Sequence, residues 1–171
     1  MREEIIIYIR KIKIEDANNF LNMLLELDKE TKYMLYEPNE RSKDINITKN
    51  IIKRSIKEND LILIVLDNKD NIIGFLSAKR YEQIRVNHIA YVVVGIREKF
   101  RGMGIGKELF SKLDLWAKEN KLKRLELTVV CSNTIAKKLY EKSGFEIEGI
   151  KKDSVIIDGK YEDEFYMAKL Y

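Results

Sequence analysis

The chain has 171 residues, of which 45% are hydrophobic, and its 32 Lys and Arg against 28 Asp and Glu leave a formal net charge of +4. This length and composition predict a single domain over residues 1–171 and exclude a disordered chain. The small charge excess is spread over interleaved lysines and glutamates, Cys131 is the only cysteine, and no apolar run reaches the ~18 residues of a membrane span. We therefore expect a cytoplasmic protein that uses neither nucleic acid nor a membrane as its partner.

The first half of the chain alternates between helical and strand patterns. It predicts a strand at Ile5–Arg10, a helix at Glu15–Lys29, a loop at Tyr33–Lys43 that holds the only proline, and a second helix at Ile45–Lys57. Two strands follow at Leu61–Leu66 and Ile72–Tyr81, separated by the polar turn Asp67–Asn71.

The second half begins with an apolar strand at His88–Ile96, whose three consecutive valines indicate burial on both faces. A glycine-rich loop at Arg101–Gly106 opens a helix with the apolar stripe Ile105, Leu109, Leu113 and Trp116. A strand at Leu125–Val129 and a helix that stops at Gly144 come next. The closing strands are Phe145–Ile150, Ser154–Ile157 and Tyr161–Leu170, the last two joined across Asp158-Gly159.

These elements predict an α/β fold with a mixed sheet. The helix between the strands His88–Ile96 and Leu125–Val129 implies a parallel crossover, whereas the hairpins require antiparallel pairs. We expect helices on both faces of this sheet.

The loop Arg101–Lys107 is the most informative stretch. At the start of a helix the first N–H groups lack internal partners, and glycines allow a phosphate to approach them closely. The P-loop pattern fails because Arg101 stands where it needs Gly, and the dinucleotide pattern G-x-G-x-x-G fails at Lys107. The pattern that fits is R-x-x-G-x-G, formed by Arg101, Gly104 and Gly106.

A second motif lies one strand further on. It runs Leu125-Glu-Leu-Thr-Val-Val-Cys-Ser-Asn133 and continues through Leu139-Tyr140 to Gly144-Phe145. With R-x-x-G-x-G before it, the chain strongly resembles the GCN5-related N-acetyltransferase (GNAT) superfamily over essentially its whole length. The tail Asp158–Met167 is similar to bacterial members near the ribosomal-protein and amino-acid N-acetyltransferase branches.

The resemblance implies a mostly antiparallel sheet of six to seven strands whose central parallel strands splay apart to hold acetyl-CoA. The pyrophosphate would lie on the amides of Arg101, Gly102, Met103, Gly104, Ile105, Gly106 and Lys107, and the pantetheine would pair with the backbone of Val94, Gly95 and Ile96. Gly95 also indicates a β-bulge that re-aims the strand; a glycine tolerated near a strand end is the alternative.

Two residues of the second motif match positions that act in the family. Tyr140 corresponds to the tyrosine that protonates the departing sulfur, although a packing role also fits its helical position. Asn133 corresponds to an asparagine that contacts the cofactor or an ordered water, and it is also a natural helix N-cap.

The general base is the open question. Many relatives carry a carboxylate where this chain has Tyr91, and a tyrosine is a poor base near neutral pH. His88 has a suitable intrinsic pKa but is more often structural in such a place, and Glu82 and Glu37 are weaker candidates. We expect Cys131 to be a buried thiol rather than a nucleophile, and one His with one Cys makes a zinc site implausible.

Together these features predict an acetyl-CoA-dependent N-acetyltransferase in which a primary amine attacks directly within a ternary complex. The amine would lie against Tyr33, Tyr36, Tyr91 and His88 and near the closing hairpin, where Glu162, Asp163 and Glu164 could attract a cation. The rival from another class is a CoA-binding module without catalysis, which the missing carboxylate at Tyr91 makes plausible. Because relatives are often dimers, a homodimer fits the resemblance.

Overall fold

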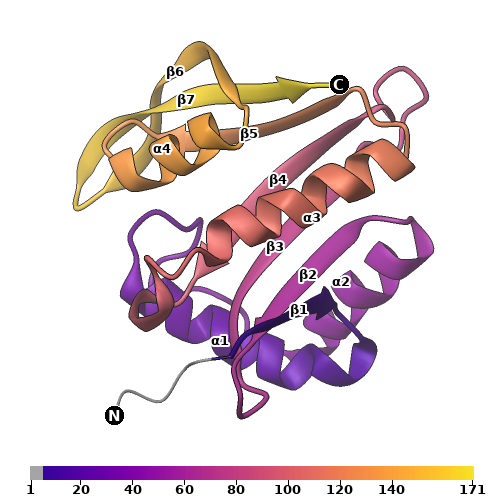
Figure 1. Ribbon diagram of the computed structural model, residues 1–171. Helices are drawn as coiled ribbons and strands as arrows, with labels where there is room; N and C mark the ends of the chain where they lie inside the picture. Colours follow the sequence, from indigo (N-terminus) through magenta and orange to yellow (C-terminus); the bar gives the residue numbers. More distant parts are fainter. Residues whose placement is uncertain (1–5) are drawn as a thin grey trace.

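The computed structural model describes residues 6–171. Figure 1 traces seven strands and four α-helices in the order β1 (Tyr8–Lys11), α1 (Ala17–Glu30), α2 (Ile45–Lys57), β2 (Leu61–Leu66), β3 (Ile72–Arg80), β4 (Ile89–Ile96), α3 (Ile105–Glu119), β5 (Arg124–Val130), α4 (Thr134–Lys142), β6 (Glu146–Ile157) and β7 (Lys160–Leu170). Short 3-10 turns at Ile14–Asp16 and Glu98–Phe100 precede α1 and the glycine-rich loop.

The strands form one seven-stranded sheet in the order β1-β2-β3-β4-β5-β7-β6. Each neighbouring pair is antiparallel except β4 and β5, which are parallel because α3 carries the chain back between them. The predicted mixed sheet is therefore confirmed, at the upper end of the expected strand count.

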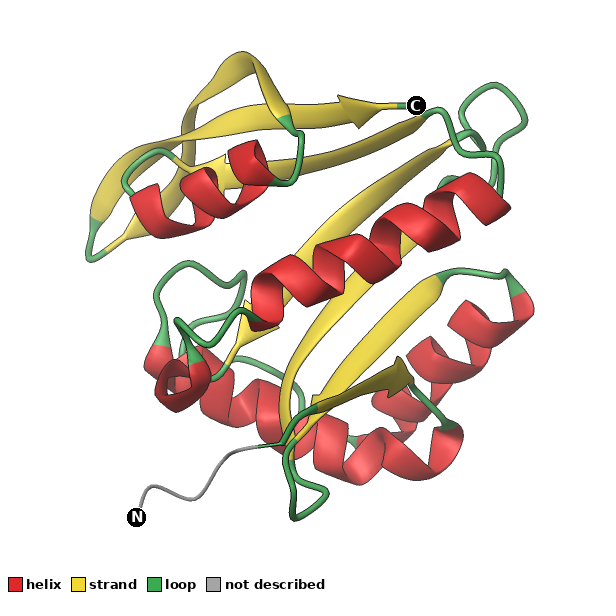
Figure 2. Ribbon diagram, in the orientation of Figure 1, coloured by secondary structure: helices red, strands yellow, loops and turns green. Residues whose placement is uncertain are grey.

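Helices cover both faces of the sheet (Figure 2), as predicted. On one face, α1 and α2 pack on the even-numbered residues of β2, such as Ile62 and Ile64. On the other face, the odd-numbered Leu61, Leu63 and Val65 belong to the core around α3 and α4. Because both faces are covered, β2 is apolar at every position rather than alternating.

The stripe expected on α3 is buried throughout. Leu109 and Leu113 are fully buried, and Trp116 is 4% exposed. Each such leucine contributes about 2 kcal/mol through apolar burial. This packing fixes the start of α3, and with it the glycine-rich loop, against the sheet.

The structure corrects one strand prediction at the end of the chain and confirms the hairpin beside it. Phe145–Ile150 and Ser154–Ile157 are not separate strands, because β6 runs continuously from Glu146 to Ile157 with register shifts between Ile147 and Gly149 and between Lys151 and Val155. The hairpin at Asp158-Gly159 is confirmed, and both residues have the positive φ of a type I′ turn. The expected start of the first strand, Ile5, lies outside the described residues.

Candidate active site between two splayed strands

The two parallel strands of the sheet pair over only part of their length. The pairing of β4 with β5 joins Ile89–Tyr91 to Arg124–Glu126 and then ends. Beyond Tyr91, β4 continues to Ile96, roughly 16 Å at the usual rise per residue. Throughout this length β4 stays paired with β3, and β5 stays paired with β7. The two halves of the sheet thus diverge, as Figure 1 shows for β4 and β5, and we call the unpaired region between the two strands beyond Tyr91 the opening.

The edge of β4 that faces this opening carries backbone groups that the sheet does not use. The N–H of Arg97 donates to Ile73 O at 2.9 Å and the N–H of Tyr81 donates to Ile89 O at 3.2 Å, so the odd-numbered residues of β4 bond to β3. Antiparallel pairing alternates, so the N–H and C=O of Val92, Val94 and Ile96 point toward β5 instead. The pairing of Tyr91 with Glu126 uses the Val92 N–H, whereas the groups of Val94 and Ile96 lie beyond the last paired residue of β5. These groups need partners from outside the sheet.

Gly95 has a different role from the one expected. The register of β3 with β4 runs through Phe75–Gly95 without a shift, so the predicted bulge is wrong, and the Gly95 backbone belongs to the edge paired with β3. A Cβ at this position would lie 2.5 Å from Leu27 Cδ2 and 2.9 Å from Phe75 Cε1. The glycine is required because α1 packs directly on the backbone of β4.

The glycine-rich loop lies at the open end, where β4 leads into α3. Gly102 and Gly104 have φ of 77° and 80°, and Gly104 is the N-cap of α3 without any side-chain cap. Within the described part of the chain, no protein acceptor takes the N–H groups of residues 102–107. Together with the positive end of the α3 dipole, these donors form a site for an anion.

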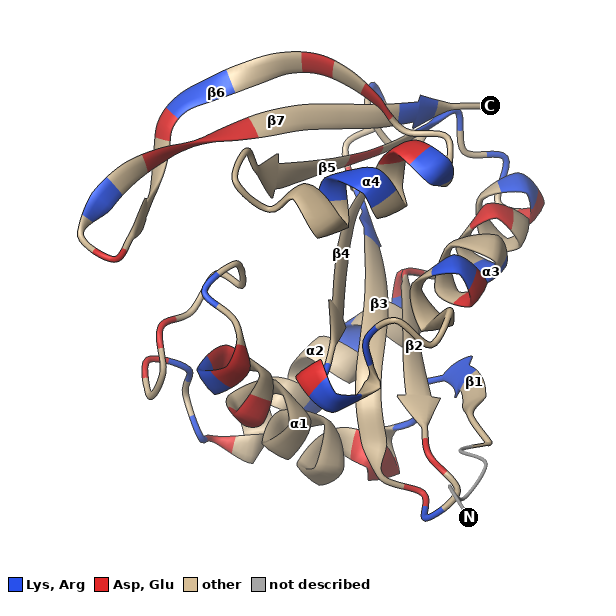
Figure 3. Cartoon of the chain, turned by 60° about the vertical axis from the view of Figure 1, so that its left-hand side comes forward, with Lys and Arg blue, Asp and Glu red and all other residues tan. Residues whose placement is uncertain are grey.

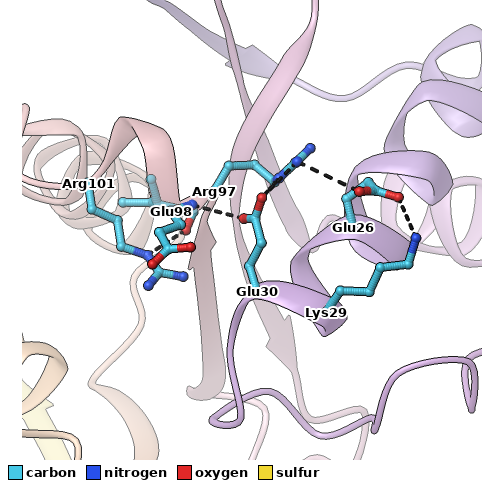
Figure 4. A network of polar contacts seen from close by, with 7 residues as sticks. Glu26, Lys29, Glu30, Arg97, Glu98 and Arg101 are labelled. Atoms are coloured by element: carbon cyan, nitrogen blue, oxygen red, sulfur yellow. Dashed lines mark hydrogen bonds and ion pairs between the residues drawn. The ribbon is translucent and has the colours of Figure 1, made fainter.

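A set of ion pairs holds this loop in place (Figure 4). The carboxylate of Glu30, at the end of α1, accepts from Arg97 Nε and from the N–H of Glu98, both at 2.9 Å. The Arg97 hydrogen bond lowers the pKa of Glu30, so this carboxylate is charged at neutral pH. Arg101 Nε donates to Ile96 O at 3.0 Å, which places the guanidinium beside the free edge of β4.

The second helix of the site, α4, packs against the loop. A Cβ on Gly106 would lie 2.7 Å from Leu139 Cδ2, so α3 and α4 touch at this glycine. Asn133 Oδ1 accepts from Ala136 N at 3.2 Å, which confirms the N-cap of α4, and Gly144 ends the helix with φ of 90°. Figure 3 shows basic residues on α4 as well as on the turn before α3.

Tyr140 is the most buried of the expected site residues on α4. Its side chain is 8% exposed and lies 5.6 Å, centroid to centroid, from the Phe110 ring. Burial raises the pKa of the phenol above its ordinary value of ~10, and the nearby Tyr91 raises it further. The hydroxyl is therefore protonated at neutral pH, as a proton donor must be.

The opposite face of the opening is lined by other residues. Since Leu125, Leu127 and Val129 pack toward α3 and α4, the alternating side chains of β5, including Thr128, project from the face that carries α1 and α2. Tyr91 Oη and Thr128 Oγ1 are 2.9 Å apart, and Thr128 Oγ1 donates to Glu164 Oε1 at 2.9 Å. The sequence suggested Glu164 only as a residue that attracts cations. It did not indicate Thr128, because a threonine within a strand is common and does not mark a site.

The expected acceptor loop lies on this second face. Lys32 Nζ pairs with Asp158 Oδ2 at 2.9 Å, so the segment after α1 meets the β6–β7 turn. Tyr36 stacks under the Arg41 guanidinium at 4.4 Å, and Arg41 in turn pairs with the buried Asp28. Tyr33 is half-buried in the same segment. The loop and the hairpin thus meet as the sequence led us to expect, whereas the contact of Tyr33 and Tyr36 with an acceptor stays a prediction.

His88 and Glu82 lie away from the opening, and Cys131 does not have the properties of a nucleophile. His88 is exposed and precedes β4 at the end where the strands are still paired, since its carbonyl accepts from Lys123 N at 3.0 Å. Glu82 is a surface residue that pairs with Arg54 at 3.4 Å. Cys131 is half-buried rather than buried, and desolvation raises the pKa of its thiol, which disfavours a nucleophilic role.

The chain is similar to known proteins over most of its length. Residues 21–145 match the Acetyltransferase (GNAT) family. The chain belongs to the GNAT family. It is 31% identical over 104 residues to the L-amino acid N-acetyltransferase AaaT of Escherichia coli, a match that spans 58% of this chain and 62% of that protein, short of two thirds of its length.

Solved GNAT structures agree over nearly the whole chain. An acetyltransferase of the GNAT family from Streptococcus pneumoniae superposes with a TM-score of 0.92 at 26% identity, covering 97% of this chain and all of that one. A ribosomal-protein-alanine N-acetyltransferase from Brucella melitensis gives 0.83 at 22% identity over 96% and 99% of the two chains. YncA of Salmonella typhimurium, solved with acetyl-CoA, gives 0.85 at 15% identity over 96% and 94%. The chain therefore has the GNAT fold, as the motifs predicted.

The described residues contain neither a membrane-spanning helix nor a metal-binding group of side chains. None of the helices in residues 6–171 is long and apolar enough to cross a membrane. Nor does this part of the chain hold a group of three or more His, Cys, Asp or Glu side chains placed to bind a metal ion.

Proposed function

We propose that this chain, acting as a single catalytic domain, binds acetyl-CoA in the opening between β4 and β5 and acetylates a primary amine by direct attack within a ternary complex. The observation that carries the proposal is the free edge of β4 at Val94 and Ile96, which leads into the donors of residues 102–107. Cofactor-bound relatives of the same fold support it.

The two sets of backbone groups fit the two parts of the cofactor. The diphosphate needs several donors at a positively polarised helix start, which residues 102–107 offer, and Arg101 and Lys107 add formal charge. The amides of pantetheine need an unpaired strand edge, which Val94 and Ile96 offer, while the Gly95 backbone bonds to β3. When bound there, acetyl-CoA supplies an acyl group on a good leaving group.

The chain brings the two reactants to the opening from opposite faces of the sheet. Tyr140 and the loop lie on the face of α3 and α4, and Tyr91 lies on the face of α1 and α2. An amine that enters past the loop after α1 would reach the thioester without an acyl-enzyme. The backbone N–H of Val94 or Ile96 would polarise the thioester carbonyl, and the Tyr140 hydroxyl would give its proton to the leaving sulfur.

The substitution Tyr140→Phe tests the proton donor. It removes the hydroxyl and keeps the packing against Phe110, so we expect turnover to fall by about 100-fold or more with little change in CoA affinity. Steady-state assays measure the turnover, and calorimetry measures the affinity for CoA. Tyr161→Phe, at a tyrosine 70% exposed on β7, is the matched control. Unchanged turnover in Tyr140→Phe would leave that residue with a packing role only.

An acceptor panel tests the function itself. We expect thiol release from acetyl-CoA with at least one class of primary amine among L-amino acids, polyamines, aminated drugs and peptide N-termini. L-Amino acids come first because of the partial match to the E. coli enzyme. CoA binding without turnover on any amine would leave only a CoA-binding module. The expected homodimer stays a prediction, for which light scattering is the measurement.

A further inference from the structure

A continuous chain of hydrogen bonds crosses three strands beneath the opening. It runs from Tyr91 on β4 to Thr128 on β5 and on to Glu164 on β7, with both oxygen–oxygen distances at 2.9 Å. The other carboxylate oxygen of Glu164 accepts from Ser154 Oγ at 2.9 Å and lies 3.8 Å from Lys151 Nζ. The Glu164 side chain is only 12% exposed.

The chemistry of the groups fixes the direction of this chain. A carboxylate can only accept, and each hydroxyl has one proton to donate. Thr128 therefore donates its hydroxyl proton to Glu164, so in the contact between Tyr91 and Thr128 the donor must be Tyr91 Oη. The Tyr91 oxygen is left with free lone pairs and no remaining proton, so it can accept a hydrogen bond from a cationic group in the opening.

The other carboxylate close to this point is already neutralised. Glu126, the register partner of Tyr91, accepts from Tyr81 Oη at 2.8 Å and from Arg124 Nε at 2.8 Å. Glu126 thus has a close guanidinium partner. Glu164 instead accepts from two neutral hydroxyls, and the nearest cation, Lys151 Nζ, lies 3.8 Å away.

We propose that Tyr91, Thr128 and Glu164 form a proton relay that deprotonates the acceptor, and that the acceptors are therefore aliphatic primary amines, which are ammonium ions at neutral pH. The inference rests on the proposed acetyl transfer. One proton passes from the ammonium nitrogen to Tyr91 Oη, the Tyr91 proton passes to Thr128 Oγ1, and the Thr128 proton passes to Glu164.

The proton balance then closes. The neutral amine forms its bond to the acetyl carbon as the carbon–sulfur bond breaks, and Tyr140 protonates the sulfur and regains a proton from the amide nitrogen. Glu164 returns its proton to water. Tyr91 carries one hydroxyl proton before and after the transfer, so it can serve in place of a carboxylate without accumulating charge.

Two acceptors that differ mainly in basicity provide the test. Methylamine is an ammonium ion at neutral pH, whereas methoxyamine is already a free base. With Thr128→Val, which deletes the relay hydroxyl, we expect methylamine turnover to fall by about 100-fold and methoxyamine turnover to stay within about threefold of wild type. Thr128→Ser restores a hydroxyl and should recover most of the methylamine rate. Glu164→Gln should show the same changes in methylamine and methoxyamine turnover as Thr128→Val.

The pH profile supplies a readout that a packing defect would not change. In Thr128→Val only methylamine that is already neutral reacts, so its rate should rise about tenfold per pH unit, while wild type rises less steeply. The ionisable groups near Glu164 include Tyr91 on β4, Glu126 on β5, Cys131 after β5 and Lys151 on β6, and all are retained in this variant.

The outcomes separate the two proposals. Equal losses with both acceptors, or full methylamine activity in Thr128→Val, would overturn the relay while leaving acetyl transfer intact. Wild-type protein that acetylates neither probe nor any amine of the panel would refute the proposed function and the relay with it. Thermal melting and CoA binding confirm that each variant is folded, and Tyr161→Phe, which removes an exposed hydroxyl on β7 that does not contact the relay, is the control.

Discussion

The close packing of α1 on β4 can be probed by adding a single methyl group. In Gly95→Ala the new Cβ would lie 2.5 Å from Leu27 Cδ2 and 2.9 Å from Phe75 Cε1. Ordinary carbon–carbon contacts are about 3.5–4.0 Å, so the Leu27 methyl has to retreat by about 1.0–1.5 Å. Leu27 is 1% exposed and Phe75 is 5% exposed, which leaves neither side chain open space to move into.

We expect this variant to lose stability without losing the fold. Overpacking a core costs typically about 1–3 kcal/mol, and two buried neighbours place Gly95→Ala in the upper half, at about 2–3 kcal/mol. For a chain of this size that corresponds to a melting temperature lower by about 4–12 °C. Urea and thermal unfolding followed by circular dichroism measure both quantities.

The matched control is Gly149→Ala on β6, where a Cβ meets nothing within 4 Å. There the reduced freedom of the unfolded chain should leave stability unchanged or raise it by up to about 1 kcal/mol. If Gly95→Ala is as stable as wild type, or if Gly149→Ala loses as much, the reasoning from close packing at β4 is wrong.

Two further residues, Glu30 and Asn133, support the site. Arg97 lowers the pKa of Glu30, so the stabilisation from Glu30 is complete above the ordinary carboxyl pKa of ~4.3 and is lost as the pH falls through its lower folded value. Glu30→Gln should therefore cost about 1–2 kcal/mol at pH 7 and nothing in strong acid, by urea unfolding across pH; an equal cost at every pH would contradict this. Glu26→Gln, at an exposed carboxylate paired only with Lys29 and Arg97 on the surface, is the control and should cost much less. Asn133→Ala should cost about 1 kcal/mol through the lost N-cap, whereas Asn133→Asp should keep stability, so a loss of CoA affinity in both would show that the amide also binds the cofactor.

Local patterns were sufficient for most of the elements. The apolar run of β2, the stripe of α3 and the turn at Asp158-Gly159 each follow from backbone periodicity or turn chemistry within a few residues, and each is confirmed. The register shift of β6 between Lys151 and Val155 could not be predicted from the local pattern. Residues 152–154 leave the ladder because Asp163, on the partner strand, accepts from the Asp153 N–H at 2.9 Å, and Phe145–Ile150 and Ser154–Ile157 therefore look like two strands when read alone.

The site divides in the same way. The glycine-rich loop, Asn133 and Tyr140 lie in short local motifs; the loop indicated a phosphate-binding helix start, and the resemblance of both motifs to those of known proteins indicated the GNAT family. The expected bulge at Gly95 was wrong because what requires the glycine is Leu27, which lies on a helix far away in the sequence.

Local sequence patterns indicate most of the strands and helices and the loop suited to a phosphate, because these depend on neighbours within one or two turns. The tertiary structure is needed to show that β4 and β5 part after Tyr91 and that Tyr91, Thr128 and Glu164 meet. The two hydrogen bonds of that chain span 37 and 36 residues. The register of strands so far apart is set by their common packing against α3 and α4, which no local pattern records.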